Sequence, residues 1–365
     1  MTQRSGGQDR PNPRPGQQEW AATRGQSLTT ADPDFVARCR RLLVELDLCA
    51  PGDTLTITPL TGGVASDIVM VQCGAARYCV KFALAKLKVA EVWRAPVHRN
   101  RAEYHWLKAA SRVVPAAVPK LFGQSDREGG FAMEYLAGDQ VFLWKTALLQ
   151  ARPDKGEAAL VGDTIGRIHA ASTKAGFDAT PFQNRDDFHA LRLEPYLLFT
   201  ATRHPDLANQ LQAMADRLYA ADSVLVHGDV SPKNILFRAD RPVILDAECA
   251  TMGDPAFDVA FCLNHLILKA LHLPQSQDRL FANVVQLWRA YASHVTWENP
   301  IDIEARICDL LAALMLARVD GKSPVEYLTE AERAVIRAVA PMLMAQPAAR
   351  LTDLIGVLTP FFKGS

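Results

Sequence analysis

The sequence predicts an α+β protein with two lobes, a small β-rich lobe over residues 31–137 and a larger, mainly helical lobe over residues 138–365. Between residues 55 and 82, short apolar stretches alternate with polar residues and are separated by glycine-rich turns, which is typical of half-buried strands. Further along the chain, apolar residues recur at i, i+4 and i+7, as from Val161 to Ile168, which is typical of amphipathic helices.

The β-rich lobe follows a polar tail. Residues 1–30 are rich in Gln, Gly, Pro and Arg, and they offer too little apolar surface to offset the entropy of ordering, so we expect a disordered tail. The lobe itself is predicted to contain a helix, three strands, a second helix and a further strand, over residues 34–48, 55–58, 67–72, 78–82, 101–111 and 130–135.

The helical lobe is predicted to be interrupted by three short strands, over residues 223–226, 235–237 and 243–245. The most apolar run of the chain, Val259–Leu273, is broken only by polar residues at three positions, and we interpret it as a buried helix rather than a membrane span. The three polar residues are Asn264, His265 and Lys269. A later helix over residues 303–319 is expected to end at Asp320-Gly321.

The composition narrows the range of partners and cellular locations that the protein could have. Forty acids balance forty bases, which argues against a nucleic-acid partner, since proteins that bind polyanions usually carry a basic surplus. No apolar run is long enough to predict a membrane partner. Seven cysteines without metal-type spacing indicate reduced thiols and therefore a cytoplasmic location. The oligomeric state is left open.

The strongest chemical pattern is the segment from Val226 to Leu236. A predicted strand ends at His227-Gly228-Asp229, and Asn234 follows five residues later beside the next strand. Transfer of a phosphoryl group to a hydroxyl needs a carboxylate that accepts or orients the proton of the nucleophile. It also needs oxygen ligands for a magnesium ion. Asp229 suits the first task and Asn234 the second.

A second pair of acids follows the next predicted strand. Asp246 and Glu248 are two residues apart, and on a continued strand both would face the same side, which suits a divalent cation with Glu248 as the helper. Asp254 then precedes Pro255, in a pattern typical of a helix N-cap followed by proline in the first turn. Each pattern alone is weak, and their order along the chain makes the set specific.

These motifs, His227-Gly228-Asp229 with Asn234, Asp246-Ala247-Glu248 and Gly253-Asp254-Pro255 with Asp258, resemble the aminoglycoside phosphotransferase and choline kinase family. The resemblance covers roughly residues 55–320 and implies a bilobal protein-kinase-like fold that uses ATP and Mg²⁺. It implies that Asp229 is the catalytic base, that Asn234 and Asp246 are metal ligands, and that His227 braces the catalytic loop. It also implies that Asp258 hydrogen-bonds the backbone of that loop.

The resemblance also assigns nucleotide-binding roles in the small lobe. It implies a strand lysine that neutralises phosphates, which we assign to Lys81, and a helix acid that positions this lysine. Glu103 is our first choice for the acid and Glu91 the second. A phosphate-covering turn is expected at Gly62, Gly63 and Ser66, and an inter-lobe hinge that binds adenine through its backbone is expected at Glu134 and Leu136.

The sequence predicts the acceptor only as a class. The stretch from Lys81 to Glu103 is similar to methylthioribose kinases, whereas Ala247 stands where choline kinases usually carry a bulky aromatic residue. Residues 141–226 contain nine bases and ten acids, and residues 259–365 contain ten of each. Because a polycationic antibiotic requires an acidic cleft, we favour a neutral hydroxyl compound such as a sugar or nucleoside derivative, with amino alcohols and antibiotics as further candidates.

Two other functions are compatible with the same motifs. The first is a non-catalytic nucleotide-binding regulator on the same fold, which the complete set of chemical residues disfavours. The second is a kinase that acts on proteins, which is disfavoured because Ser231 stands two residues after Asp229, where protein kinases carry lysine. The sequence therefore predicts an ATP-dependent phosphotransferase with a small-molecule hydroxyl acceptor.

Overall fold

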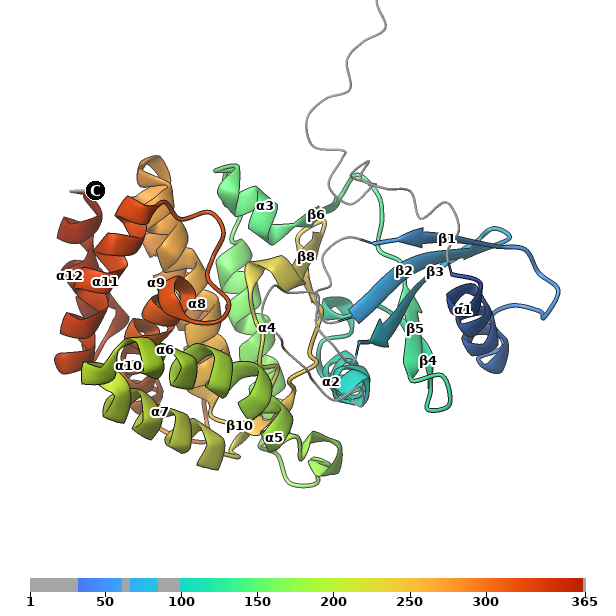
Figure 1. The fold of residues 1–365 in the computed structure, drawn as a ribbon, viewed down its shortest axis with the longest axis horizontal. Coiled ribbons are helices and arrows are strands. Elements are labelled where there is room, and N and C mark those ends of the chain that lie inside the picture. The colour runs from blue at the N-terminus through green and yellow to red at the C-terminus, as the bar shows by residue number, and fades with distance from the viewer. Residues whose placement is uncertain (1–31, 61–65, 85–98, 364–365) are drawn as a thin grey trace, which may run out of the picture.

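The structure is a computed structural model of the chain, and it describes residues 32–60, 66–84 and 99–363. The predicted tail, residues 1–30, lies outside the described residues. Figure 1 shows an antiparallel sheet near the N-terminus, followed by a mostly helical remainder that ends at the C-terminus on the opposite side of the molecule. The predicted α+β fold with a small β-rich and a large helical lobe is therefore confirmed.

The small lobe contains a five-stranded sheet with the strand order β1-β2-β3-β5-β4, in which every neighbouring pair is antiparallel. Its helix α1 precedes β1, and α2 lies between β3 and β4 in the chain. These elements are α1 (Pro33–Glu45), β1 (Leu55–Pro59), β2 (Ser66–Cys73), β3 (Ala76–Ala83), α2 (Arg99–Val113), β4 (Leu121–Ser125) and β5 (Gly130–Glu134).

The two faces of β3 pack against different parts of the molecule. Val80 and Phe82 belong to a buried cluster that includes Leu42 of α1. Cys79 belongs to the main core, which includes Trp106 of α2. Because successive side chains of a strand point to opposite faces, Lys81 lies on the same side as Cys79 and therefore toward α2. The alternation of the strand thus directs this lysine to the boundary between the lobes.

The large lobe is built from helices, with five short strands that form a two-stranded and a three-stranded sheet. Its strands are β6 (Val141–Leu143), β7 (Val224–Val226), β8 (Ile235–Arg238), β9 (Arg241–Ile244) and β10 (Thr251–Gly253). Its helices are α3 (Trp144–Leu149), α4 (Glu157–Ser172), α5 (Arg185–Phe188), the π-helical η3 (His189–Leu198), α6 (Phe199–Arg203), α7 (Ala208–Ala220), α8 (Pro255–His272), α9 (Gln277–Ala292), α10 (Pro300–Asp320), α11 (Glu330–Ala345) and α12 (Leu351–Lys363). The remaining elements in the described residues are five short 3₁₀ turns: Pro115–Ala117, Thr180–Phe182, Pro205–Leu207, Pro232–Asn234 and Pro274–Ser276.

Helix α8 is the centre of the large lobe and packs against α9 and α10. Every residue from Pro255 to Leu271 is buried, including the three polar residues that interrupt its apolar sequence. The helix begins as the sequence predicts, because the Asp254 side chain accepts a hydrogen bond of 2.9 Å from the amide of Ala256 and proline occupies the first turn. Across the described ranges, no helix combines the length and apolar character that a bilayer span requires.

Candidate active site

The loop between β7 and β8 carries Asp229, whose carboxylate is buried. Its Oδ2 atom lies 2.9 Å from Nη2 of Arg192 and 3.1 Å from Nζ of Lys233. Its Oδ1 atom is also buried, and no described residue hydrogen-bonds it. Leaving a buried carboxylate oxygen without a partner is unfavourable. A proton or a ligand that bonds this atom would remove that cost.

The two cations also keep Asp229 ionised. Burial alone would raise the pKa of the Asp229 carboxyl, but Lys233 and Arg192 outweigh burial and lower the pKa below its usual value. Arg192 is itself buried, and it also donates to the backbone carbonyls of Gly228 and Leu191. Arg192 was not predicted from the sequence, because this residue lies in the π-helical η3 segment and belongs to no motif.

Asp258, in the first turn of α8, fixes the shape of this loop. Its carboxylate accepts hydrogen bonds from the amides of His227, at 2.6 Å, and Gly228, at 2.8 Å. His169 lies 3.2 Å from the same carboxylate. The bonds to the loop amides match the role that the family resemblance implied for Asp258, whose side chain is buried behind the loop.

His227 occupies the inner side of the loop and packs edge-on against Trp106 of α2. Its Nδ1 atom accepts a hydrogen bond of 3.1 Å from the Asp229 amide, and Nε2 lies 3.1 Å from the Leu245 carbonyl. Burial lowers the pKa of His227, which favours the neutral ring that this arrangement needs. Both ring nitrogens bond backbone atoms, so we propose that His227 positions Asp229 and does not itself exchange protons with a substrate.

Gly228 has the left-handed backbone that the turn before Asp229 requires, with φ of +81°. A Cβ atom at this position would lie 2.7 Å from Cβ and 2.9 Å from the carbonyl oxygen of Cys249. Both the backbone angle and the close approach therefore require glycine, which explains the glycine of the His-Gly-Asp motif.

Lys81 brings the small lobe to the same region, and it is only 1% exposed. Its Nζ atom lies 2.6 Å from Glu103 on α2, 2.5 Å from Asp246 and 3.0 Å from Glu248. Burial would lower the pKa of Lys81, but the three carboxylates outweigh it and raise the pKa well above its ordinary value, so the ammonium stays charged. Glu103 is thus the acid of α2 that binds Lys81, whereas the second choice for the helix acid, Glu91, lies outside the described residues.

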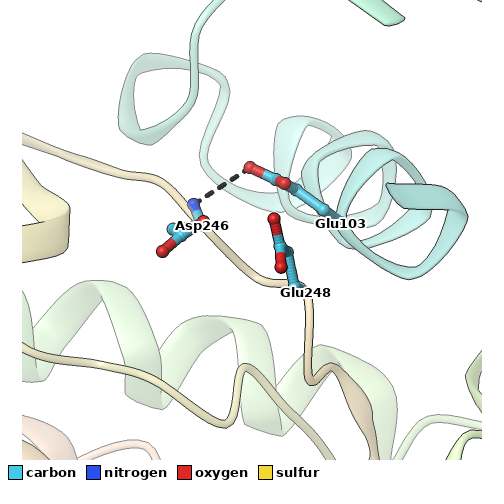
Figure 2. Close-up of side chains that lie close together, drawn as sticks. All are labelled: Glu103, Asp246 and Glu248. Carbon is cyan, nitrogen blue, oxygen red and sulfur yellow. Dashed lines mark hydrogen bonds between the residues drawn. The ribbon is translucent and has the colours of Figure 1, made fainter. Parts of the chain in front are cut away.

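We call Glu103, Asp246 and Glu248 the interlobe carboxylates, and Figure 2 shows them converging from α2 and from the loop after β9. One oxygen from each lies within 4.8 Å of the others. The Asp246 amide donates a hydrogen bond of 3.1 Å to Glu103, drawn as the dashed line. Burial raises the pKa of Glu103 to about 7, while Lys81 opposes this effect.

Asp246 and Glu248 are positioned differently from the sequence-based expectation. Strand β9 ends at Ile244, so both acids lie in the following loop rather than on a continued strand, and Asp246 has a positive φ of 72°. Asp246 keeps 33% of its side chain exposed, whereas Glu248 is buried and also binds Arg99 Nε at 2.7 Å and the hydroxyl of Ser66. We infer that Glu248 mainly holds these donors in place, and that Asp246 is the more accessible ligand.

Asn234 lies between the catalytic loop and Asp246. The side-chain amide of Asn234 donates a hydrogen bond of 3.1 Å to the backbone carbonyl of Asp229. The backbone carbonyl of Asn234 accepts a hydrogen bond of 2.9 Å from the backbone amide of Leu245. These bonds place Asn234 beside both Asp229 and the residue that precedes Asp246. Oxygen atoms of an amide and a carboxylate form the donor set that Mg²⁺ prefers, so the residues present fit a magnesium ion.

The remaining predicted residues belong to the expected phosphate-covering turn and to the expected hinge between the lobes. Ser66 begins β2 and contacts Glu248, whereas Gly62 and Gly63 lie outside the described residues. Glu134 ends β5 and binds Arg238 at 2.9 Å, and Leu136 follows β5 as it leads into the large lobe. The side chain of Glu134 thus stabilises the connection between the lobes. Arg99, four residues before Glu103 on α2, was missed, although its spacing places it on the same helix face.

Comparisons with known proteins identify the family of this chain. A profile of the phosphotransferase enzyme family matches residues 56–294. The chain is 24% identical over 245 residues to a methylthioribose kinase from Geobacillus thermodenitrificans (strain NG80-2), in a match that covers 59% of this chain. The matched part spans 60% of the length of that relative.

Among the solved structures that match, one supports the fold. An amicoumacin kinase solved with AMP-PNP and Ca²⁺ matches with a TM-score of 0.52 and 15% identity, over 82% of this chain and 91% of the other. A choline/ethanolamine kinase family protein from Mesorhizobium loti matches with a TM-score of 0.49 and 19% identity, over 91% and 99% of the two chains. The expected protein-kinase-like fold is confirmed, and with its profile match over most of its length this chain belongs to the phosphotransferase enzyme family.

Proposed function

We propose that this protein is a kinase that transfers the γ-phosphoryl group of ATP to a hydroxyl of a small molecule, with Mg²⁺ as cofactor. The observation that carries the proposal is the state of Asp229. One of its oxygens is held by Arg192 and Lys233, the other is buried without a partner, and its pKa is lowered. A preorganised, ionised carboxylate of this kind suits the base that accepts or orients the proton of an attacking hydroxyl.

The proposed binding of ATP depends mainly on Lys81. Its ammonium is charged, buried and held at the boundary between the lobes by Glu103. A fixed cation of this kind offsets the negative charge of phosphate oxygens without reorganising during the reaction. The hinge at Glu134 and Leu136 and the turn with Gly62, Gly63 and Ser66 complete the proposed nucleotide site.

For the metal, we propose Asn234 and Asp246 as ligands, with Glu248 as the residue that supports them. When bound, Mg²⁺ neutralises charge on the phosphates during transfer. The protein contributes two oxygen donors whose backbone positions are fixed by the bonds of Asn234 to Asp229 and Leu245.

The acceptor class is a small hydroxyl compound such as a sugar, a nucleoside-like compound, an amino alcohol or an antibiotic. The methylthioribose kinase relative supports such an acceptor. We place the activity in the cytoplasm, because all seven cysteines are free thiols, as in proteins of reducing compartments.

The test is a panel of hydroxyl metabolites and antibiotics, with formation of ADP measured by a coupled assay. We expect at least one acceptor to be phosphorylated by the wild-type protein. With that acceptor, Asp229→Asn should lower kcat by about 10²–10⁴-fold while nucleotide binding changes little, because the base acts mainly in the transition state. An Asp229→Asn variant that retains wild-type kcat would overturn the assignment of the base.

A further inference from the structure

Two cations inside the large lobe form no ion pair with any acid of the described residues. Lys269 of α8 is 1% exposed, and its Nζ atom makes one long hydrogen bond, of 3.4 Å, to the His265 carbonyl. Arg318 of α10 is 8% exposed and donates to the carbonyl and hydroxyl of Ser323 and, at 3.3 Å, to the hydroxyl of Tyr196. No carboxylate of the described residues lies within 4.0 Å of either cation, which we call the buried cations.

Other polar groups in this region also lack partners. The Nε atom of Arg318 and the hydroxyl of Tyr327 are buried and make no hydrogen bond with any described residue. The same is true of both polar side-chain atoms of Asn264, which precedes His265 on α8. The ring of Tyr327 lies 4.8 Å from Nζ of Lys269, and the unpartnered Nε belongs to Arg318 itself. Two unused donors therefore lie at or beside the buried cations.

The surroundings are positively charged. His265 has its pKa lowered well below the usual value by burial first and then by four cations: Arg318, Lys269, Lys233 and Lys145. Of these cations, Lys145 is neutralised by Glu326 and Lys233 by Asp229. Among the described residues, neither buried cation has a carboxylate within 4.0 Å, although the charge of Glu326 acts on Lys269 from farther away.

A continuous path of contacts joins the buried cations to the catalytic base. Arg192, which binds Asp229, lies 5.8 Å from the centre of the Phe261 ring. Phe261 packs against His265 and against Tyr196, the residue that binds Arg318. At 1.5 Å per residue, the eleven residues from Asp258 to Lys269 span about 16 Å along α8, which sets the distance that a ligand would bridge between the catalytic loop and the buried cations.

Burying an unpaired charge is strongly unfavourable unless a partner compensates for it, and at Lys269 this cost appears as a pKa that burial lowers from 10.5 to about 7. Packing does not require these charges, because an apolar side chain of similar size would fill the same volume without the penalty. A ligand that brings negative charge would compensate for both cations and would also accept bonds from the unused donors.

We propose that Lys269 and Arg318 bind an anionic group, a carboxylate or a phosphate, on the molecule whose hydroxyl is phosphorylated at Asp229. The acceptor is then a hydroxyl compound with an anionic group roughly 16 Å from the reacting oxygen, by the helical rise of α8. This inference rests on the proposed function and revises the neutral acceptor that the balanced charge counts favoured. The counts missed it because they weigh exposed and buried charges equally.

The first experiment measures anion binding without turnover. The full-length protein, saturated with AMP-PNP and Mg²⁺ to fill the nucleotide site, is melted in sulfate, phosphate or malonate and in chloride of equal ionic strength. We expect the wild-type Tm to rise more in at least one polyvalent anion than the Tm of Lys269→Met or Arg318→Met. Comparing the rise in Tm in phosphate with the rise in malonate, a dicarboxylate, shows whether the site prefers a phosphate or a carboxylate group.

Two variants serve as controls. Arg217→Gln removes one exposed cation that is paired with Asp309 on the surface of the same lobe, and it should respond to anions as the wild type does. Arg318→Lys keeps the charge and should restore part of the response. In chloride, Lys269→Met should melt a few degrees above the wild type, because it removes an uncompensated buried charge, so loss of folding does not explain a lost response.

The second experiment compares acceptors in the ADP-release assay, using hydroxy acids and phosphorylated alcohols against their amides or neutral parents. We expect kcat/KM to be at least 100-fold higher for the anionic member, and Lys269→Met to reduce this preference at least 10-fold through KM. An anion response that is equal in wild type and variants, or a neutral acceptor with unchanged kcat/KM in Lys269→Met, would overturn the anionic site. A variant-sensitive response without any turnover would support this site while the kinase assignment fails.

Discussion

Replacing Arg192 by methionine should destabilise the large lobe far more than the same replacement of Lys233, although both residues contact the same oxygen of Asp229. The distances are nearly equal, 2.9 Å for Arg192 and 3.1 Å for Lys233. The exposure differs, because Arg192 is buried whereas the Lys233 side chain is 44% exposed.

The magnitude follows from these distances. At 2.9 Å and an effective dielectric constant of about 20, the attraction between Arg192 and Asp229 is about 6 kcal/mol. Removing Arg192 also removes the cost of dehydrating its guanidinium, and measured losses for one partner of a buried pair are about 3–5 kcal/mol. The exposed pair with Lys233 should contribute at most about 1 kcal/mol, because water and salt screen it.

The assay is urea denaturation of the full-length variants, followed by tryptophan fluorescence, at pH 7. We expect the midpoint of Arg192→Met to fall sharply and that of Lys233→Met to stay close to the wild-type value. The pKa of Asp229 should rise in both variants, because Lys233 and Arg192 both lower it, so the kcat of each variant should fall more steeply than that of the wild type as the pH is lowered. Equal midpoints for the two variants would refute the assignment of Arg192 as the buried partner of the base.

Three further outcomes are expected. Gly228→Ala should lower stability by about 1–3 kcal/mol and abolish most turnover, because alanine at φ +81° would collide with Cys249, whereas Gly356→Ala, in open space on α12, should be neutral or slightly stabilising in the same urea titration. Asp258→Asn should lower stability by about 2 kcal/mol and reduce kcat, because one charged acceptor of two loop amides is lost; unchanged stability and kcat would contradict the role given to Asp258. Lys269→Met should be more stable than the wild type near pH 6.5, by a few kcal/mol at most, and this advantage should shrink toward pH 10. The reason is that burial lowers the folded-state pKa of Lys269 from 10.5 to about 7, so between these values the unfolded chain binds more protons and wild-type stability rises with pH. Parallel stability–pH curves for the two proteins would contradict this account of Lys269. The charged groups that act on Lys269 are Lys145, Glu326 and Arg318.

Much of the fold was predictable because local patterns and tertiary burial agree. The strands around Lys81 alternate as half-buried strands do, and the apolar run of α8 is the helix that the structure buries most completely. The capping pattern at Asp254 also acts locally, so the sequence was sufficient to predict it.

The candidate site was predictable only where its residues lie in short motifs. Asp229, Asn234 and Asp246 come from one segment of strands and loops, and the structure brings them together with Lys81. Arg192 reaches Asp229 from a distant π-helical segment, and no spacing in the sequence connects the two residues. The same holds for Arg318 and Lys269, which become neighbours of one Tyr-rich region only when α8 and α10 pack together.

The central claim is that Lys81 of the small lobe and Asp246 of the large lobe act on one nucleotide. The most direct test is calorimetric binding of AMP-PNP with and without Mg²⁺ to the wild-type protein, Lys81→Met and Asp246→Asn. We predict that Mg²⁺ strengthens binding to the wild type, that Lys81→Met weakens binding at least 10-fold with or without Mg²⁺, and that Asp246→Asn loses the Mg²⁺-dependent gain. Wild-type affinity and Mg²⁺ dependence in either variant would contradict a shared site between the lobes.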